Sequence, residues 1–283
     1  MRKLFLYSLL ISFLFPSISM SEESKSYIQS PLYYNFLKED NTDLLKFRPL
    51  SGWGVIRFPS SEQPEDKYNF ILEGAFQKEL DIAKYNNRLS LTAFAHLNYV
   101  IDSEKYDYNN KLKPATGIKL RYFPINNVVL ETGILYEWDR RFSTDRTLEG
   151  TQVFLNGFSS WDLNKLIKNN YDYPGFTWFS LRHPGSQDKE EQDNIIIEGA
   201  FQQGIDWYKK DDKTVNSFVE IKYILDKEKY SWNNHMTYSL GSRFKIPVTE
   251  KLMIQPGVKY SFNRRFKTGN TEQKAMLFVD WYF

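Results

Sequence analysis

The feature that most constrains the fold is the alternation of side chains over the last nine residues, Ala275 to Phe283. Counting back from Phe283, every second residue is apolar, whereas the intervening row contains the only charge, Asp280. This is the period of a β-strand, whose successive side chains point to opposite faces. The strand therefore has one wholly apolar face and one mixed face. An apolar face with aromatic residues at its end suits contact with lipid at the headgroup level.

This ending resembles the C-terminal targeting strand of bacterial outer-membrane barrels, which ends in Phe after apolar residues at every second position. The resemblance implies an assembly signal that the barrel assembly machinery reads. The matching residues are Leu277, Val279, Trp281 and Phe283. The closing strand of a soluble β-sandwich is the alternative that this stretch alone leaves open.

The first residues have the organisation of a secretory signal peptide. Arg2 and Lys3 precede an apolar core from Leu4 to Phe15, and small residues follow. We expect residues 1–21 to be the signal peptide, residues 22–50 a periplasmic N-terminal segment, and residues 51–283 the barrel. The chain contains no cysteine, so it forms no disulfide.

The composition agrees with a membrane β-barrel. Mean hydropathy is −0.54 although aromatic residues reach 17%, as expected where only alternate strand residues face lipid. Arg2 and Lys3 belong to the leader, so the 37 basic residues fall to 35, which equals the acidic count. This balance gives no reason to expect nucleic acid as a partner. We expect the outer membrane as the location, with its lipids and lipopolysaccharide as surroundings.

The chain also repeats itself. Asn69–Gln77 reads NFILEGAFQ and returns 125 positions later as Asn194–Gln202, NIIIEGAFQ. Asp102–Asn110 returns 124 positions later as Asp226–Asn234. These spacings predict two tandem repeats, about 51–160 and about 175–283. On the same alignment, Thr151–Ser159 is the counterpart of the C-terminal strand.

Each repeat contains about six strand patterns. They are expected near 51–58, 69–80, 89–101, 114–123, 128–139 and 150–160, and again near 175–183, 194–207, 215–225, 236–246, 251–264 and 274–283. The connections alternate between short turns and long polar loops, as in membrane barrels. The predicted fold is all-β, a transmembrane antiparallel β-barrel of about twelve strands. Two tandem sandwiches fit less well, because six strands with a lipid-type face do not close naturally.

Alternation also assigns the charged residues to the lumen. Arg or Lys on the lipid face costs about 2–4 kcal/mol at the membrane midplane, so we expect these side chains to point inward. They either form structural ion pairs that fill the barrel or line a path for a polar solute. The lumen candidates are Arg57, Glu73, Lys119, Arg121, Glu131, Arg182, Glu198, Glu220, Lys222, Arg243, Lys245 and Lys259.

The sequence contains no nucleophile elbow, phosphate loop or metal-spaced cluster. Its three histidines, His96, His183 and His235, lie far apart. Glu73 and Glu198 are equivalent in the repeats, and paired carboxylates perform glycosidic chemistry. A duplication, however, produces such pairs without any catalytic need. We therefore predict no catalytic residue, metal or cofactor, and keep a barrel enzyme as an alternative.

Two stretches, Gly117–Arg141 and Gly241–Arg265, follow the pattern G-x-x-x-R-x-x-P, short turn, strand, charged end. They resemble the C-terminal barrels of NfrA-type phage-adsorption proteins and of exopolysaccharide-export proteins. The second stretch departs from the pattern, with Lys245 for the Arg and Pro247 one place early. Those proteins usually carry a long periplasmic helical-repeat region, for which residues 22–50 leave no room. The resemblance implies an outer-membrane barrel.

Two hypotheses of function follow besides the enzyme. The first is a narrow polar pore for saccharide or other small polar solutes, as part of a polysaccharide export system. The second is a surface receptor or adhesion scaffold, for example for phage adsorption, with a plugged lumen.

Overall fold

The computed structural model describes residues 45–63, 66–106, 109–164, 166–167, 170–230 and 233–283. The predicted signal peptide and residues 22–44 of the predicted periplasmic segment lie outside this range. Among the described residues, no helix has the length and apolar character needed to cross a membrane.

The described chain is built almost entirely from strands, with two short 3-10 turns, η3 (Asn86–Arg88) and η4 (Lys189–Glu191). The first strand is the two-residue β1 (Lys46–Phe47). The others are β2 (Ser51–Phe58), β3 (Ile71–Tyr85), β4 (Leu89–Asp102), β5 (Lys111–Ile125), β6 (Val128–Arg141), β7 (Arg146–Asp162), β8 (Pro174–His183), β9 (Ile196–Lys210), β10 (Lys213–Asp226), β11 (His235–Pro247), β12 (Met253–Arg265) and β13 (Thr271–Tyr282).

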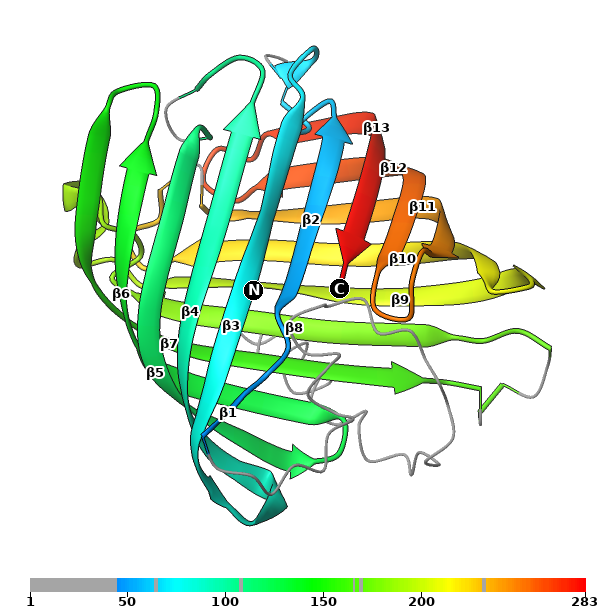
Figure 1. Ribbon diagram of the computed structural model, residues 1–283. Coiled ribbons are helices and arrows are strands. Elements are labelled where there is room, and N and C mark those ends of the chain that lie inside the picture. Colours follow the sequence, from blue (N-terminus) through cyan, green and yellow to red (C-terminus); the bar gives the residue numbers. More distant parts are fainter. Residues whose placement is uncertain (1–44, 64–65, 107–108, 165, 168–169, 231–232) are drawn as a thin grey trace.

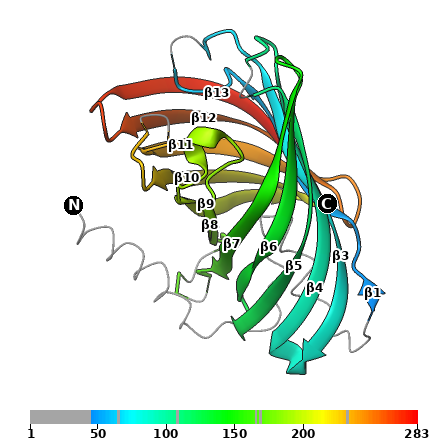
Figure 2. The same ribbon diagram turned by 90° about the vertical axis from the view of Figure 1, so that its left-hand side faces the viewer.

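Strands β2 to β13 form a closed antiparallel ring of 12 strands (Figure 1). Each strand pairs with its neighbours in sequence, and β2 closes the ring by pairing with β13. The short β1 extends the line of β2 along β3. Figure 2 shows the strands curving round a common lumen. The predicted all-β antiparallel barrel of about twelve strands is confirmed.

Most predicted strands match the observed ones, although several extend further. The clearest difference is β3, which continues to Tyr85 instead of ending near residue 80. The alternation persists through this extension, because Glu79 and Asp81 are buried while Lys78 is exposed. The charge of Asp81 made the segment after residue 80 look like a polar connection, but in the barrel Glu79 and Asp81 point inward and pair.

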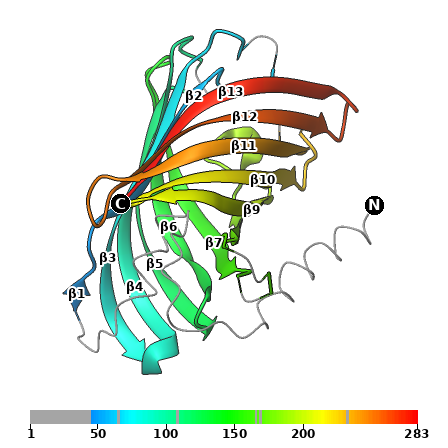
Figure 3. The ribbon, with the colours of Figure 1, turned by 90° about the vertical axis from the view of Figure 1, so that its right-hand side faces the viewer.

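The connections alternate in length as expected. Residues 126–127 and 211–212 make short turns at one end of the barrel, and 59–70 and 184–195 make long loops at the other. The C-terminus lies at the short-turn end, beside the β11–β12 turn (Figure 3). The connection at 163–173 is the long exception at this end.

The two faces of the strands differ as the alternation predicts. In β13, Met276, Phe278 and Tyr282 are buried, whereas Leu277 between them is 60% exposed. Further exposed apolar residues on the outside include Leu240, Phe244 and Val258, while many charged residues are buried. A closed ring satisfies every strand's backbone groups, which is what the hydrocarbon of a membrane requires. The protein is therefore built as a transmembrane β-barrel, the architecture of outer-membrane proteins.

Aromatic rings on glycines hold the seam between the last and first strands. The backbones of Phe283 and Gly52 exchange two hydrogen bonds, each 3.0 Å long, and the Phe283 ring lies 5.9 Å from that of Phe76. A Cβ atom on Gly54 would collide with the indole of Trp281. The absence of a side chain on each glycine thus gives the ring of the neighbouring strand its place.

The same device appears with its partners exchanged between β7 and β8. There the glycine, Gly157, is on the earlier strand, and the ring of Phe179 on β8 occupies the space above it. The C-terminal strand instead supplies the ring, Trp281. The duplication of the chain stays a prediction from the sequence, but its proposed counterparts are locally alike in this respect.

We predict that Phe283→Ala lowers the yield of assembled barrel, because the change removes the terminal ring from the seam and leaves the closing strand edges poorly held. The readout is the fraction that migrates as the compact, heat-modifiable form on unboiled SDS gels of outer membranes. Ser159→Ala is the control, since the hydroxyl of this buried serine makes no hydrogen bond. Normal assembly of Phe283→Ala would show that the terminal residue neither acts as an assembly signal nor stabilises the contact between β13 and β2.

Candidate functional site in the barrel lumen

The lumen contains a cavity of about 890 Å³. Its lining includes Ser186 and Asn233 from the loops at the long-loop end, so the cavity reaches toward that end. Of the predicted lumen residues, those that line the cavity are Arg57, Glu73, Lys119, Glu131, Arg182, Glu198, Glu220, Lys222, Arg243 and Lys259. The remaining two, Arg121 and Lys245, are buried in side-chain clusters nearer the short-turn end.

The first cluster, which we call the Arg121 cluster, joins β3, β5 and β6. Arg121 is fully buried, and its guanidinium donates to Glu131 Oε1 at 2.6 Å and to Glu79 Oε1 at 2.7 Å. Lys119 Nζ lies 2.5 Å from Glu79 Oε1 and 2.9 Å from Glu131 Oε1. Two cations and two carboxylates therefore neutralise one another. Such charge-assisted bonds offset the cost of removing the four groups from water.

Arg48, which precedes the twelve-strand ring in the sequence, also contacts this cluster. Arg48 follows β1, and its Nε donates to Asp81 Oδ1 at 3.0 Å. Asp81 also accepts from the hydroxyl of Thr92 on β4 at 3.1 Å. Arg48 Nε lies 3.7 Å from Glu79 Oε2. The short β1 is thus anchored to the inside of the barrel wall as well as to the edge of β3.

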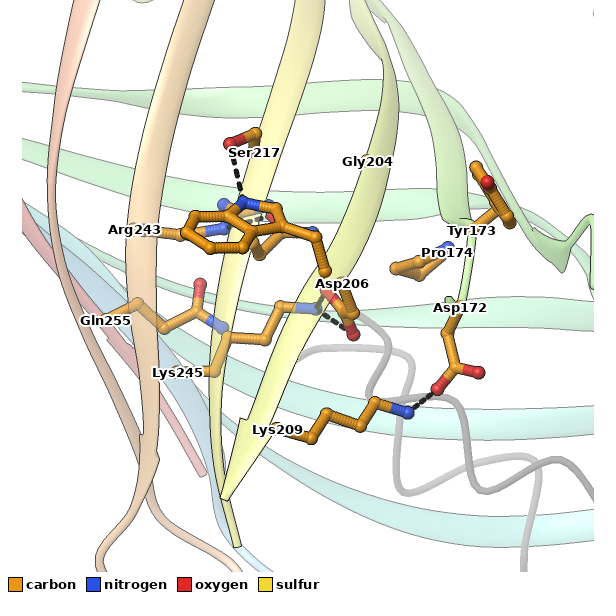
Figure 4. Close-up of polar contacts among 12 residues, drawn as sticks. Asp172, Tyr173, Pro174, Gly204, Asp206, Lys209, Ser217, Arg243, Lys245 and Gln255 are labelled. Atoms are coloured by element: carbon orange, nitrogen blue, oxygen red, sulfur yellow. Dashed lines mark hydrogen bonds and ion pairs between the residues drawn. The ribbon is translucent and has the colours of Figure 1, made fainter. Parts of the chain in front are cut away.

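The second cluster, which we call the Asp206 cluster, lies on β9, β10 and β11 (Figure 4). Lys245 Nζ is 2.7 Å from Asp206 Oδ1, which also accepts from the amide of Asn216 at 2.6 Å. Arg243 donates to Asn216 Oδ1 at 3.0 Å and to Gln202 Oε1 at 2.5 Å. This cluster uses amides where the Arg121 cluster uses a second carboxylate.

Each cluster carries a pair of phenylalanines with a cation over one ring. Phe94 and Phe154 meet edge-to-face at 5.9 Å, and Lys119 Nζ lies 5.1 Å from the Phe94 centroid. Phe218 and Phe278 meet edge-to-face at 6.1 Å, and the Arg243 guanidinium carbon lies 4.4 Å from the Phe218 centroid. These cation–π contacts place the charged groups on an apolar base.

Both clusters lie toward the short-turn end of the lumen, and we call them its floor. Other inward residues there are equally enclosed: Val129 is 0%, Gln255 1% and Phe158 2% exposed. We call the cavity, which reaches from these clusters toward the long loops, the cup. The floor and the cup therefore differ in accessibility rather than in composition.

The charged groups that a solute can reach lie above this floor. Arg57 Nη2 is 2.9 Å from Glu73 Oε1, with the two side chains 21% and 25% exposed. Arg182 pairs with Glu198 at similar exposures, 27% and 24%. Lys222 is 45% exposed. By contrast, the groups of the Arg121 cluster are at most 4% exposed.

Three acidic residues of the two clusters were missing from the sequence prediction: Glu79, Asp81 and Asp206. A signal for two of them was available, because the inward row that contains Glu73 continues through Ala75 and Gln77 to Glu79 and Asp81. Asp206 lies 125 positions after Asp81, so the predicted repeat would have supplied the third.

The arrangement is suited to hydrogen bonding and ion pairing with a polar solute. Glu73 and Glu198, considered above as a carboxylate pair, are each paired with an arginine. His96 also lines the cavity, where its Nε2 is 3.2 Å from the Asn98 amide. No group of His, Cys, Asp or Glu in the described part of the chain is arranged to hold a metal ion.

Comparison with known proteins found no matching family model and no matching curated protein. Among solved structures, the chain is similar to the β domain of the Bordetella autotransporter BrkA, with 10% identity, TM-score 0.43 and coverage of 83% of this chain and 97% of that one. An outer-membrane channel from Pseudomonas putida F1 gives 9% identity, TM-score 0.44 and coverage of 87% and 99%. A bacterial polysaccharide outer-membrane secretin gives 11%, 0.39, and 86% and 99%. The resemblance to NfrA-type barrels stays a prediction.

We predict that Arg121→Met destabilises the barrel by about 3–5 kcal/mol, because it leaves buried carboxylates without enough positive charge. Adding Glu131→Gln restores charge balance and should recover most of the loss. The measurement is urea unfolding in detergent micelles, followed by tryptophan fluorescence.

Arg140→Met is the matched control. Arg140 pairs with Asp145, but the two side chains are 41% and 85% exposed, so this change should cost less than about 1 kcal/mol. Equal losses for Arg121→Met and Arg140→Met would show that the Arg121 cluster contributes no more than a surface pair.

Proposed function

We propose that the barrel is a narrow polar pore whose cup receives a small, hydroxyl-rich solute such as a saccharide from the long-loop side. The observation that carries this proposal is the pair of accessible arginine–glutamate contacts in the cup, Arg57 with Glu73 and Arg182 with Glu198. Charged groups that remain partly exposed are able to exchange their contacts with each other for contacts with a solute.

The charge of the cavity supports a solute without large net charge. The cations that line it are Arg57, Lys113, Lys119, Arg182, Lys222, Arg243 and Lys259. The anions are Glu73, Glu131, Glu137, Glu191, Glu198, Glu220 and Asp280. Their formal charges cancel, so the lining as a whole favours neither a cation nor an anion. Closely spaced donors and acceptors of this kind match the hydroxyl groups of a sugar.

A place in polysaccharide export is the narrower form of this proposal. Its support is the sequence resemblance of Gly117–Arg141 to the barrels of exopolysaccharide-export proteins. In that setting the cup would hold part of a sugar chain as it passes the outer membrane.

A second function is favoured by the floor of the lumen. Arg121 and Lys245 are 0% and 2% exposed in their ion pairs, and buried pairs of this kind hold a single conformation firmly when all their partners are present. If the floor stays closed, the barrel serves as a surface receptor or adhesion scaffold whose long loops bind the partner. Conduction distinguishes the two functions.

We predict that the purified protein forms small, discrete channels in planar bilayers and that Lys222→Glu shifts their ion preference toward cations. Lys222 is the most exposed of the seven cations that line the cup, at 45%. Reversing its charge therefore alters the electric field along the path with little effect on packing. The measurement is the reversal potential in a KCl gradient.

Lys251→Glu is the control, because Lys251 is exposed on the β11–β12 turn outside the lumen and should leave the reversal potential unchanged. Absence of any channel at all voltages, with partner binding that depends on the long loops, would replace the pore by the scaffold.

A further inference from the structure

Two tryptophans occupy matched positions on opposite walls of the cup. Trp53 on β2 and Trp178 on β8 both line the cavity and are both half-buried. β8 is the sixth strand along the ring from β2 in either direction, so the two residues lie on opposite sides of the lumen. A large aromatic ring that is only half-buried in a polar cup is available to a ligand.

The surroundings of the two tryptophans correspond residue by residue. Trp53 stands between Ala75 and Tyr282 on the neighbouring strands. Trp178 stands between Ala200 and Phe158. Each tryptophan thus has an alanine on one side and a buried aromatic residue on the other. Both alanines are buried, and each indole also packs against a buried apolar cluster, so the part of each ring that stays exposed is the part that lines the cavity.

An arginine–glutamate pair follows each tryptophan along the same inward row. Arg57 and Arg182 are four residues beyond their tryptophans, a separation of about 13 Å along a strand. Their partners Glu73 and Glu198 come from the next strand, opposite Val55 and Ser180 respectively. Each wall therefore presents an aromatic ring at one level and a neutral donor–acceptor pair at the next.

The third strand at each position adds one more polar group. Asp280 on β13 lies opposite Val55, and Asn156 on β7 lies opposite Ser180. Both line the cavity. The side-chain oxygen of Asn156 is buried without a hydrogen-bond partner, which is costly unless a ligand or solvent supplies a donor. The two walls thus share their plan but differ in one charge.

This combination has the chemistry of a sugar-binding subsite. One face of a pyranose ring exposes C–H groups, which pack on the π-face of an indole, whereas its rim carries hydroxyls. A carboxylate accepts from these hydroxyls and a guanidinium donates to them. We propose that the cup binds an uncharged oligosaccharide at two matched subsites, Trp53–Arg57–Glu73 on β2 and β3 and Trp178–Arg182–Glu198 on β8 and β9.

The proposal rests on the proposed function and names its substrate class. The sugar is uncharged because each arginine is already neutralised by its own glutamate. A uronic-acid chain would bring its carboxylates next to Glu73 and Glu198, whose arginines are already paired. The neighbouring cations Lys222 and Arg243 already face Glu220 and Asp280. By the strand rise, the backbone positions of Glu73 and Glu198 lie about 7 Å, and those of Arg57 and Arg182 about 13 Å, along the row from the tryptophans, so each wall is long enough to contact more than one sugar unit.

The test is equilibrium binding of three uncharged trisaccharides of different linkage, maltotriose, cellotriose and isomaltotriose, to the full-length barrel in detergent. Trigalacturonate is the charged comparison. We expect at least one uncharged sugar to bind at two sites and more tightly than trigalacturonate. Trp53→Ala and Trp178→Ala should each weaken one of the two sites about tenfold, and the double variant should weaken both.

Trp207→Ala is the matched control. Trp207 is 48% exposed on the outer surface of β9 and donates to Ser217, so its loss should leave sugar binding unchanged. The proposal is overturned if none of the uncharged sugars binds, if trigalacturonate binds more tightly, or if the double variant binds like the unmodified protein.

Conductance of the same preparations separates this outcome from failure of the pore. If channels form but sugar binding does not depend on Trp53 and Trp178, the proposed subsites are wrong and the pore stands. If sugar binding depends on both tryptophans but no channels form, the proposed subsites stand and the pore is wrong.

Discussion

Neutralisation of charge inside a closed ring of strands is the constraint on which the rest of this structure depends. Closure satisfies the backbone in a membrane and leaves each strand with one face to lipid and one to the lumen. All the charge of the strands must then gather in a narrow space. Arg121 illustrates the result, because its guanidinium is fully buried and yet lies within 2.6 to 2.7 Å of two carboxylates. The lumen is stable only as a balanced set.

The exposure of the paired charged groups distinguishes those that stabilise the barrel from those that could contact a solute. In the Arg121 cluster the side chains are at most 4% exposed, so a solute has little access to them, and loss of one partner leaves the others without a counter-charge. The Arg57–Glu73 pair has the same chemistry but is 21% and 25% exposed. Its groups keep their charge balance and still face the cavity. One pattern of residues thus produces a floor at one level and a binding wall at the next.

The sequence was sufficient to predict the class of fold, the number of strands and the face of most charged residues. Period-two alternation places Glu73 inward and Leu72 outward without knowledge of any partner. It does not predict which charges meet. Arg121 on β5 binds Glu79 on β3, with β4 lying between them, and such a contact depends on the curvature and register of the closed ring. Asp81 was also missed because a charged strand end resembles a loop, whereas Glu79 lay within the predicted strand and was left out of the inward row.

The wall around β3 and the wall around β9 have similar inward rows, but they differ at the level of the two clusters. The inward row of β3 carries Glu79, whereas the corresponding row of β9 has Gly204, whose missing side chain leaves space that Asn216 partly fills. The Asp206 cluster consequently binds Lys245 with a single carboxylate. Its hydrogen bonds to Arg243 come from neutral amides, and Asp280 lies 4.0 Å from the Arg243 guanidinium. Amide contacts are weaker than contacts between full charges. Of the two clusters, the one on β9 to β11 therefore costs less to rearrange.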